Sequence, residues 1–504
     1  MSSLTVPPIL ATLIGRIGAA VPARARASFL ELLMGAAATK GGHVTDAILA
    51  TGLSRAWTTY YWFLEYGRWS WLQVWQTLPG ALTALFAPAV WHVIVDDTVT
   101  ERMSIRAPAS LIHHNHHAKP NRPPFLRGQG WLCLAAVVER GWKVGAVPLM
   151  LRLVRRGTNR GKLKSARFLL RLLGQRLGHV RVLLDAWFMR GRLITRTLAD
   201  GHTVIGRVRR DLALYKVPKP PRRRCRGRPR KYGERLTRAR VEALPVQRSA
   251  QILYGKLEVV RYRSCRVAAR FLKGTVVRAV WVELERPEHR DKPREQRLLI
   301  CTDPNLPALD VITSYAKRWA VEPLFKDIKH GWGLKDAWQR SRQGLMRWVT
   351  LLGVGYALTQ MLAFTNPARL AGRARPAPWR PPGTQTAGVI QAGIARILHE
   401  LGLPAFIAAM SAKIRADACH PGGPSLPMLF HVLGTVFSKT NIEGQIGHSA
   451  QTVNLGPSQG GYVEFTIKHR GAYPFVTHSF ADMMRGAMGA FVTEGVPDSA
   501  AGAF

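Results

Sequence analysis

Acidic residues are scarce in this chain. Among its 504 residues, Asp and Glu together number 30, whereas Lys and Arg number 73, which gives a formal net charge of +43 at pH 7. A surplus of this size repels itself unless an anionic partner neutralises it. The composition favours nucleic acid as that partner, because cations that contact phosphates supply much of the affinity of proteins for nucleic acids. A membrane surface is the alternative, but the sequence shows no lipidation signal and no anchor helix, so we expect no membrane partner.

Cysteine is also rare. The five cysteines are scattered and none forms a Cys-x-x-Cys pair, which is typical of a reducing cytoplasm and argues against a structural zinc site. No signal peptide is evident near the first residues. The apolar run at 348–364 is short and contains glycine, so it predicts a buried helix and not a membrane span. We therefore expect a cytoplasmic protein.

Hydrophobic periodicity and composition predict an α/β protein with helical regions at both ends. Five parts are expected: a helical N-terminal DNA-binding domain at 1–88, the first part of a core at 89–205, a basic and β-rich insertion at 206–295, the second part of the core at 296–365, and a linker, C-terminal helices and a Gly/Ser-rich tail at 366–504. Within the first part, residues 45–60 resemble a helix-turn-helix with Arg55 exposed for DNA contact. A purely structural helical hairpin explains that segment equally well.

Carboxylates follow two predicted buried strands. Asp96 and Asp97 end the apolar run that begins at Trp91, and Asp185 ends the run that begins at Val180. Adjacent carboxylates at the end of a buried strand are unfavourable through desolvation and mutual repulsion, and a bound cation would relieve both. The alternative is a turn with Asp as its polar cap, which explains one Asp better than two.

A third carboxylate lies in a charged helical stretch. Tyr315, Arg318, Glu322 and Lys329 are spaced Tyr-x2-Arg-x3-Glu-x6-Lys, which places all four on one arc of roughly 60° of a helix. Such an arc is suited to face a metal ion and a phosphate backbone, whereas Trp319 and the other apolar residues fall on other arcs and are expected to pack inward. Pro323 predicts a kink or a fresh helical start, and a solvated charged helix is the alternative interpretation.

The insertion contains a strongly basic segment. Arg226, Arg228 and Arg230 belong to Arg-Gly-Arg-Pro-Arg, the core of an AT-hook, which lays arginines into the narrow minor groove of A·T-rich DNA. A flexible basic linker that holds phosphate without choosing sequence is the other interpretation.

Three acidic positions in the order strand, strand, helix, with a β insertion before the helical Glu, resemble the Asp-Asp-Glu (DDE) transposases of bacterial insertion sequences. The Tyr-Arg-Glu-Lys spacing resembles the branch of that family with a β-strand insertion, over roughly residues 90–365. The resemblance implies an RNase H-like core in which Asp185 and Glu322 hold two Mg²⁺ ions, with Mn²⁺ as a substitute. The remaining metal ligand is Asp96, which the Asp-x-Thr pattern favours, or Asp97.

The same resemblance implies metal-dependent cleavage and strand transfer at the ends of an insertion sequence, by a homodimer on paired ends near the nucleoid. Tyr315, Arg318 and Lys329 would grip phosphates of the terminal inverted repeats, and Trp281 would stack on a flipped base. Two other functions remain open: a catalytically inactive DNA-binding protein derived from a transposase, and a nuclease of the same fold that hydrolyses DNA without joining it.

Overall fold

The computed structural model describes most of residues 7–410 and the strands between 428 and 493. The segments outside the description are 1–6, 51–54, 115–122, 155–158, 219–229, 286–295, 366–384, 403, 409, 411–427, 433–437, 443–444, 448–452, 456–460, 468, 470–471, 478–487 and 494–504. The chain divides into two compact units: Met1–Leu10 with Ala20–Phe406, and Ala11–Ala19 with Ile407–Phe504. Each unit is described by itself.

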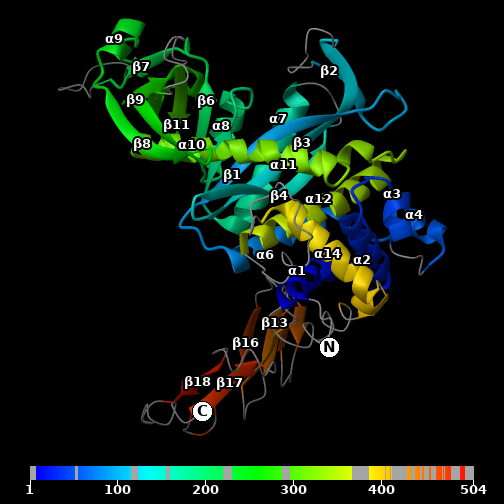
Figure 1. The fold of residues 1–504 in the computed structure, drawn as a ribbon. Coiled ribbons are helices and arrows are strands. Elements are labelled where there is room, and N and C mark those ends of the chain that lie inside the picture. Colours follow the sequence, from blue (N-terminus) through cyan, green and yellow to red (C-terminus); the bar gives the residue numbers. More distant parts are fainter. Residues whose placement is uncertain are drawn as a thin grey trace. The chain divides into compact units, whose positions relative to one another are not determined.

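The N-terminal region is helical, as its sequence predicts (Figure 1). Its helices are α1 (Pro8–Ala19), α2 (Ala23–Ala38), α3 (Val44–Ala50), α4 (Trp57–Glu65), α5 (Trp71–Gln76) and α6 (Leu78–Leu85). Arg55 precedes α4 and pairs with Glu31 of α2 at 3.4 Å, so its charge is partly neutralised within the protein. The turn of the expected helix-turn-helix lies in 51–54, outside the described residues.

One mixed sheet of eleven described strands organises the first unit. The strands are β1 (Trp91–Glu101), β2 (Ser110–His114), β3 (Phe125–Arg140), β4 (Lys143–Leu153), β5 (Val180–Leu184), β6 (Thr203–Val208), β7 (Leu214–Lys216), β8 (Gln247–Leu253), β9 (Lys256–Ala269), β10 (Thr275–Glu285) and β11 (Arg297–Cys301). The order is β2-β3-β1-β5-β6-β11-β10-β9-β7, with β4 on β3 and β8 on β9. Strands β1, β5 and β6 run parallel, and the other described pairs are antiparallel.

Strand β1 differs from its prediction. It does not end at the two aspartates but continues through Asp96 and Asp97 to Glu101, because β3 pairs with it along this whole length. The parallel ladder with β5 does end there, and its last pair is Val95 with Leu184. Asp96 and Asp185 are therefore the next residues on two neighbouring parallel strands, at the carboxyl end of their shared ladder.

The expected insertion does not form a separate sheet in the described residues. Strand β11 pairs antiparallel with β6 on one side and with β10 on the other, so β7 to β10 extend the central sheet. This part also contains the short helices α9 (Arg238–Glu242) and η1 (Arg270–Leu272).

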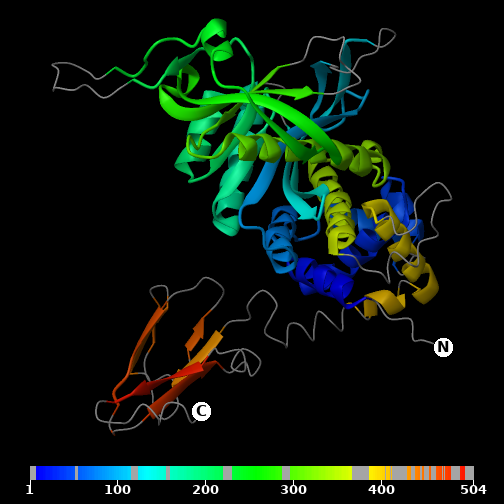
Figure 2. The ribbon, with the colours of Figure 1, turned by 60° about the vertical axis from the view of Figure 1, so that its left-hand side comes forward.

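Helices cover the sheet, and Figures 1 and 2 show α10 and α11 running along one of its faces. These helices are α7 (Asn159–Leu177), α8 (Gly191–Ala199), α10 (Ala308–Ala316), η3 (Lys317–Ala320), α11 (Val321–His330), η4 (Leu334–Asp336), α12 (Arg342–Thr365) and α14 (Ala387–Leu401). Among the described residues, α12 alone is long and apolar enough to cross a membrane, but it is almost wholly buried against β4, α2 and α14. The prediction of a buried helix in this segment is confirmed.

The second unit contains described strands where the sequence predicts a helical segment and a tail without a clear period. They are β12 (Met428–Val432), β13 (Lys439–Ile442), β14 (Gln445–Gly447), β15 (Val453–Leu455), β16 (Gly461–Glu464), β17 (Ala472–Thr477) and β18 (Met488–Val492). They form two antiparallel sheets, ordered β15-β12-β17-β18 and β14-β13-β16. The prediction of C-terminal helices and a Gly/Ser-rich tail did not include these strands.

Candidate active site

The charged signature lies on two helices with a tight turn of 3₁₀ helix between them. Helix α10 carries Tyr315, η3 carries Arg318, and α11 begins at Val321 and carries Glu322 and Lys329. Pro323 falls in the first turn of α11, where its missing N–H costs least because the first N–H groups of a helix have no partner in that helix. The fresh helical start predicted from Pro323 is confirmed.

Arg318 links two of the three predicted catalytic carboxylates. Its Nη1 donates to Oδ2 of Asp96 at 2.7 Å, and its Nη2 lies 3.8 Å from Oε1 of Glu322. The Asp96 and Arg318 side chains are largely buried, whereas that of Glu322 is 51% exposed. Burial lowers the pKa of Arg318, but the charges around it, led by Asp96, raise it above its ordinary value. The guanidinium of Arg318 therefore stays positively charged between the buried carboxylate of Asp96 and the half-exposed carboxylate of Glu322.

Asp185 is the neighbour of Asp96 at the end of the parallel ladder. Its Oδ1 accepts a hydrogen bond from the backbone N–H of Phe188 at 2.9 Å, which fixes the turn that follows β5. Burial raises the pKa of Asp185. Burial and the charge of Asp185 raise the pKa of Asp96 to about 7, even though Arg318 and the backbone N–H of Asp97 oppose that rise. Both carboxyl groups are thus harder to ionise than that of an exposed aspartate.

Asp97 has a different partner. Its Oδ2 lies 2.6 Å from Nζ of Lys162 on α7, and the same ammonium lies 4.1 Å from the ring centroid of Trp187, two residues after Asp185. Successive side chains of a strand point to opposite faces, which gives Asp96 and Asp97 these separate surroundings. Sequence reasoning missed Lys162, because nothing in its local sequence indicates that α7 begins beside β1.

Lys329 and Tyr315 flank this centre. Burial lowers the pKa of Lys329, while the charges of Glu322 and Glu101 oppose that shift. Burial raises the pKa of Tyr315, which also interacts with Arg318, Asp185 and Arg207. All four residues of the signature therefore gather around the carboxylates, even though they do not share one continuous helix.

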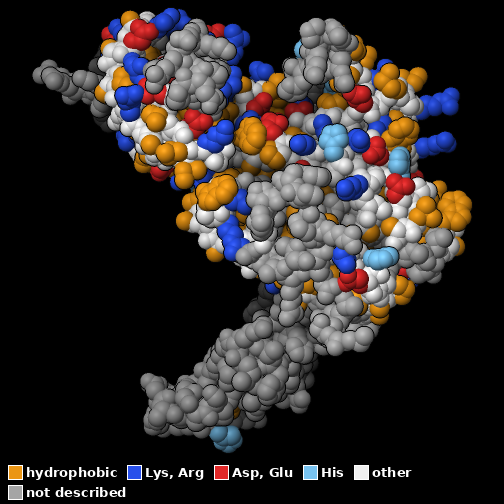
Figure 3. Space-filling view, in the orientation of Figure 1, with side chains coloured by type: hydrophobic (Ala, Val, Ile, Leu, Met, Phe, Trp, Pro, Cys, Tyr) orange, Lys and Arg blue, Asp and Glu red, His pale blue; other side chains and the backbone are white. Residues whose placement is uncertain are grey.

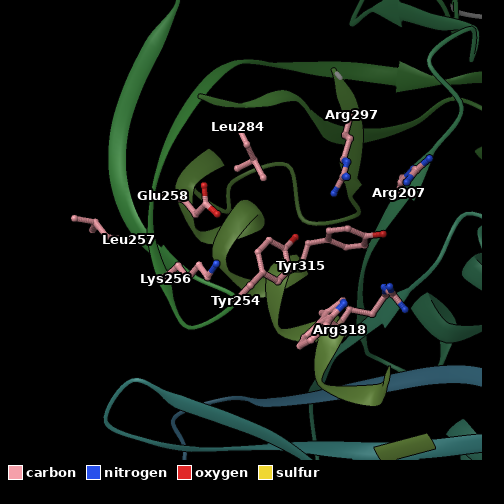
Figure 4. A pocket seen from close by; sticks show the side chains of 10 residues that line it. Arg207, Tyr254, Lys256, Leu257, Glu258, Leu284, Arg297, Tyr315 and Arg318 are labelled. Carbon is pink, nitrogen blue, oxygen red and sulfur yellow. The ribbon is translucent and has the colours of Figure 1, made fainter. Parts of the chain in front are cut away.

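A cavity of about 550 Å³ opens beside Tyr315 and Arg318. Figure 4 shows Tyr315, Arg297 and Arg207 lying close together on one side of it, with Tyr254 and Lys256 from the β8–β9 turn on the other. The rings of Tyr254 and Trp319 lie 6.3 Å apart, nearly perpendicular. Trp319 is 50% exposed, so the expectation that it packs inward is wrong. Sequence reasoning also missed Tyr254, Arg207 and Arg297, which come from strands that only the sheet order brings here.

Trp281 lies elsewhere. It is 6% exposed in β10 and lines a different cavity, together with Leu298, on the sheet face opposite to the one presented by Leu284 and Arg297. This position is a correction, because a buried ring on the far face is not placed to stack on a base beside Tyr315. Of the AT-hook arginines, Arg230 is exposed, whereas Arg226 and Arg228 lie outside the described residues.

The donor set suits a hard divalent cation. Within the described part of the chain, no three acidic, histidine or cysteine side chains gather closely enough to hold a metal ion as they stand, because Arg318 lies between Asp96 and Glu322. The chemistry of the residues nevertheless fits, since carboxylate oxygens are the ligands that Mg²⁺ prefers. Burial raises the pKa of Asp96 and of Asp185, and a cation held between them would offset the cost of keeping both carboxylates charged.

Residues 146–356 match the family model described as the transposase DDE domain. The matched segment contains Asp185, Glu322 and the rest of the Tyr-Arg-Glu-Lys signature, whereas β1 with Asp96 precedes it. This part of the chain, 211 of its 504 residues, is therefore similar to a transposase DDE domain.

A short stretch of the chain is also similar to curated proteins of a different class. Over 77 residues the chain is 36% identical to copper-containing nitrite reductases of Neisseria meningitidis and Neisseria gonorrhoeae. That stretch is 15% of this chain and 20% of each reductase, so the chain spans about a fifth of the length of the curated relatives it matches.

Proposed function

We propose that this protein is a Mg²⁺-dependent DNA transposase that cleaves DNA at the ends of an insertion sequence and joins those ends to a new site. The observation that carries the proposal is the meeting of Asp96 and Asp185 at the end of the β1–β5 ladder, with Arg318 joining Asp96 to Glu322. The family match to a transposase DDE domain supports the reaction class. On this view β1 to β6 with α7 and α10 to α12 form an RNase H-like core.

Asp96, Asp185 and Glu322 would hold the metal ions, and Asp96 is preferred to Asp97 because Lys162 already neutralises Asp97. Two bound Mg²⁺ ions, or Mn²⁺ in their place, would activate the attacking oxygen and stabilise the leaving oxygen of an in-line displacement. Glu322 reaches from the exposed start of α11, so it can turn toward Asp96 once Arg318 has moved aside.

Arg318 would change partners when DNA binds. Its present partner Oδ2 of Asp96 becomes a metal ligand, and the guanidinium then turns to a phosphate, for which its planar fork is suited. Tyr315 interacts with Asp185 and Lys329 with Glu322, and both side chains would hold neighbouring phosphates of the terminal inverted repeat.

The cavity beside Tyr315 would receive a nucleotide drawn out of the duplex near the cut. Tyr254 and Trp319 supply exposed rings for base stacking, and Arg207 and Arg297 supply charge for its phosphate. These two rings take the role that the sequence suggested for Trp281. Arg55, the AT-hook arginines, action as a homodimer on paired ends and a cytoplasmic, nucleoid-associated location remain parts of the proposal.

The test is an assay with a supercoiled plasmid that carries the element's terminal inverted repeats, in Mg²⁺. We expect double-strand cleavage and joined products from the wild type, and a loss of at least about a thousandfold in Asp185→Asn and Glu322→Gln, because each removes a charge that positions a metal ion. DNA binding in EDTA should persist in both variants. Cleavage that survives Asp185→Asn would show that the assigned site is wrong, and cut but unjoined products would indicate a nuclease.

A further inference from the structure

A second basic groove begins next to the candidate active site. It has a volume of about 770 Å³ and lies between α7, α8 and the η1 turn. Five cations line it: Lys164, Arg167, Arg192, Arg196 and Lys273. Its lining contains no carboxylate, and within the described residues none of the five has an acidic partner.

The cavity beside Trp281 differs from this groove, because acidic residues accompany the cations that line it. That cavity also contains several arginines, but Asp211, Glu242 and Glu283 line it too, and Arg238 pairs with Glu242 at 2.7 Å. The cations of the α7–α8 groove, by comparison, are exposed and uncompensated. An uncompensated row of cations on a folded surface is complementary to a polyanion.

The groove adjoins Lys162, the ion-pair partner of Asp97. Lys162, which pairs with Asp97, directly precedes the groove residue Leu163, and Trp187, which the same ammonium contacts, lies just before α8. Gly191 allows the start of α8 to lie close to the backbone of Phe271 at this end of the groove. A Cβ at this position would lie 2.5 Å from the backbone oxygen of Phe271. The groove therefore starts at the side of the carboxylates that faces away from Arg318.

We propose that the α7–α8 groove holds the backbone of the target DNA into which the cut ends are joined. The inference rests on the proposed function, in which the Tyr315 and Arg318 side of the centre holds the transposon end. An in-line displacement brings the attacking and leaving oxygens from opposite sides of the phosphorus. The target duplex therefore needs a binding surface on the side of the centre opposite to the transposon end. Lys and Arg side chains in the groove would bind the phosphates of that duplex without reading its sequence.

The first experiment measures binding without chemistry. The full-length chain is titrated with a fluorescent random-sequence duplex in EDTA at several salt concentrations. The double variant Arg192→Ala/Arg196→Ala is compared with Arg209→Ala/Arg238→Ala, which removes two exposed arginines that are already paired with Asp211 and Glu242. We expect the slope of log affinity against log salt to fall by about two for the groove variant, since each phosphate contact contributes about 0.9. Equal slopes for the two double variants would overturn the proposal.

The second experiment separates target DNA from the DNA that flanks the element. Cleavage of the donor plasmid and joining to a separate target plasmid are scored in the same reaction. We expect joining to fall about tenfold or more in the groove variant while cleavage stays within about twofold of wild type. An equal loss of cleavage and joining would assign the groove to flanking donor DNA and overturn the target assignment. A wild type that neither cuts nor joins would refute the proposed function, and the salt slopes would still report on the groove.

Discussion

Asp96 shows how burial sets the chemistry of a single residue. Its pKa of about 7 lies well above the ordinary value of about 3.9 for an aspartate in an unfolded chain, because folding desolvates the group and places Asp185 beside it. Between these two values the folded protein binds a proton that the unfolded chain releases. The free energy of unfolding of the metal-free protein therefore falls as the pH rises from about 4 to about 7.

Replacing this carboxyl should remove the pH dependence that it causes. We predict that Asp96→Asn raises the stability of the protein in EDTA at pH 8 by roughly 2–4 kcal/mol, and by little at pH 4.5, because the amide still accepts from Arg318 but carries no charge. Thermal or urea denaturation across this pH range measures the difference. Asp97→Asn is the matched control and should lose the ion pair with Lys162 without this gain. A gain for Asp96→Asn that is the same at both pH values would contradict the assigned cause.

The candidate carboxylates could be predicted from the sequence, but the residues that surround them could not. Asp96, Asp97, Asp185 and Glu322 stand out because carboxylates are rare in the chain and follow apolar strands or belong to a spaced signature. The choice between Asp96 and Asp97 depends on which face of β1 meets Arg318 and which meets Lys162, and that is a tertiary fact. Trp281 and Trp319 were misjudged for the same reason, since periodicity alone cannot tell which face of a strand or helix is covered.

Among the elements, α12 is tied to the turn between α4 and α5 by one buried cation. Arg347 is 5% exposed, and it donates to the carbonyls of Leu64 at 3.0 Å, Glu65 at 3.2 Å and Trp69 at 2.9 Å, and also to that of Gly67. Its guanidinium also lies 5.1 Å from the centroid of the Trp69 ring. The turn between α4 and α5 therefore has its carbonyls satisfied by a side chain of a helix nearly 280 residues further along the chain.

We predict that Arg347→Met lowers the free energy of unfolding by roughly 3 kcal/mol or more, because it leaves several buried carbonyls without a donor. Arg347→Lys should recover only part of the loss, since one ammonium cannot span the same set of oxygens. The measurement is urea denaturation followed by tryptophan fluorescence. The control Arg396→Met breaks a surface pair with Glu400 and should cost less than about 1 kcal/mol. Equal costs for the two variants would contradict this role of Arg347.

Elements were predicted well where their pattern is local and poorly where it is not. The start of the strand at Trp91, the strand at 180–184 and the buried helix at 342–365 follow apolar runs that can be identified directly in the sequence. The union of the insertion with the central sheet depends on the pairing of β11 with β6 and β10, which no short-range pattern encodes. The strands from Met428 onwards are only three to six residues long, which is too short for a clear alternation of apolar and polar residues in the sequence.

At the scale of the whole molecule, charge is divided unequally between the two units. Residues 407–504 contain six Lys or Arg and six Asp or Glu, so the entire surplus of +43 belongs to residues 1–406. Figure 3 shows Lys and Arg side chains spread over the described surface around the sheet strands β7 to β10. The segment that matches the transposase DDE domain thus lies in the strongly basic part of the chain, whereas residues 407–504 carry no net charge.

The central claim is that carboxylates from three distant segments share divalent cations, and it depends on the fold of the entire first unit. The direct measurement is anomalous scattering from crystals of the full chain grown with Mn²⁺ and a terminal-repeat duplex. We predict strong peaks between Asp96 and Asp185, at coordination distance of about 2.2 Å from their oxygens, with Glu322 turned inward and Arg318 moved to a phosphate. Mn²⁺ peaks that lie away from both aspartates, with Arg318 still bound to Asp96, would contradict the account.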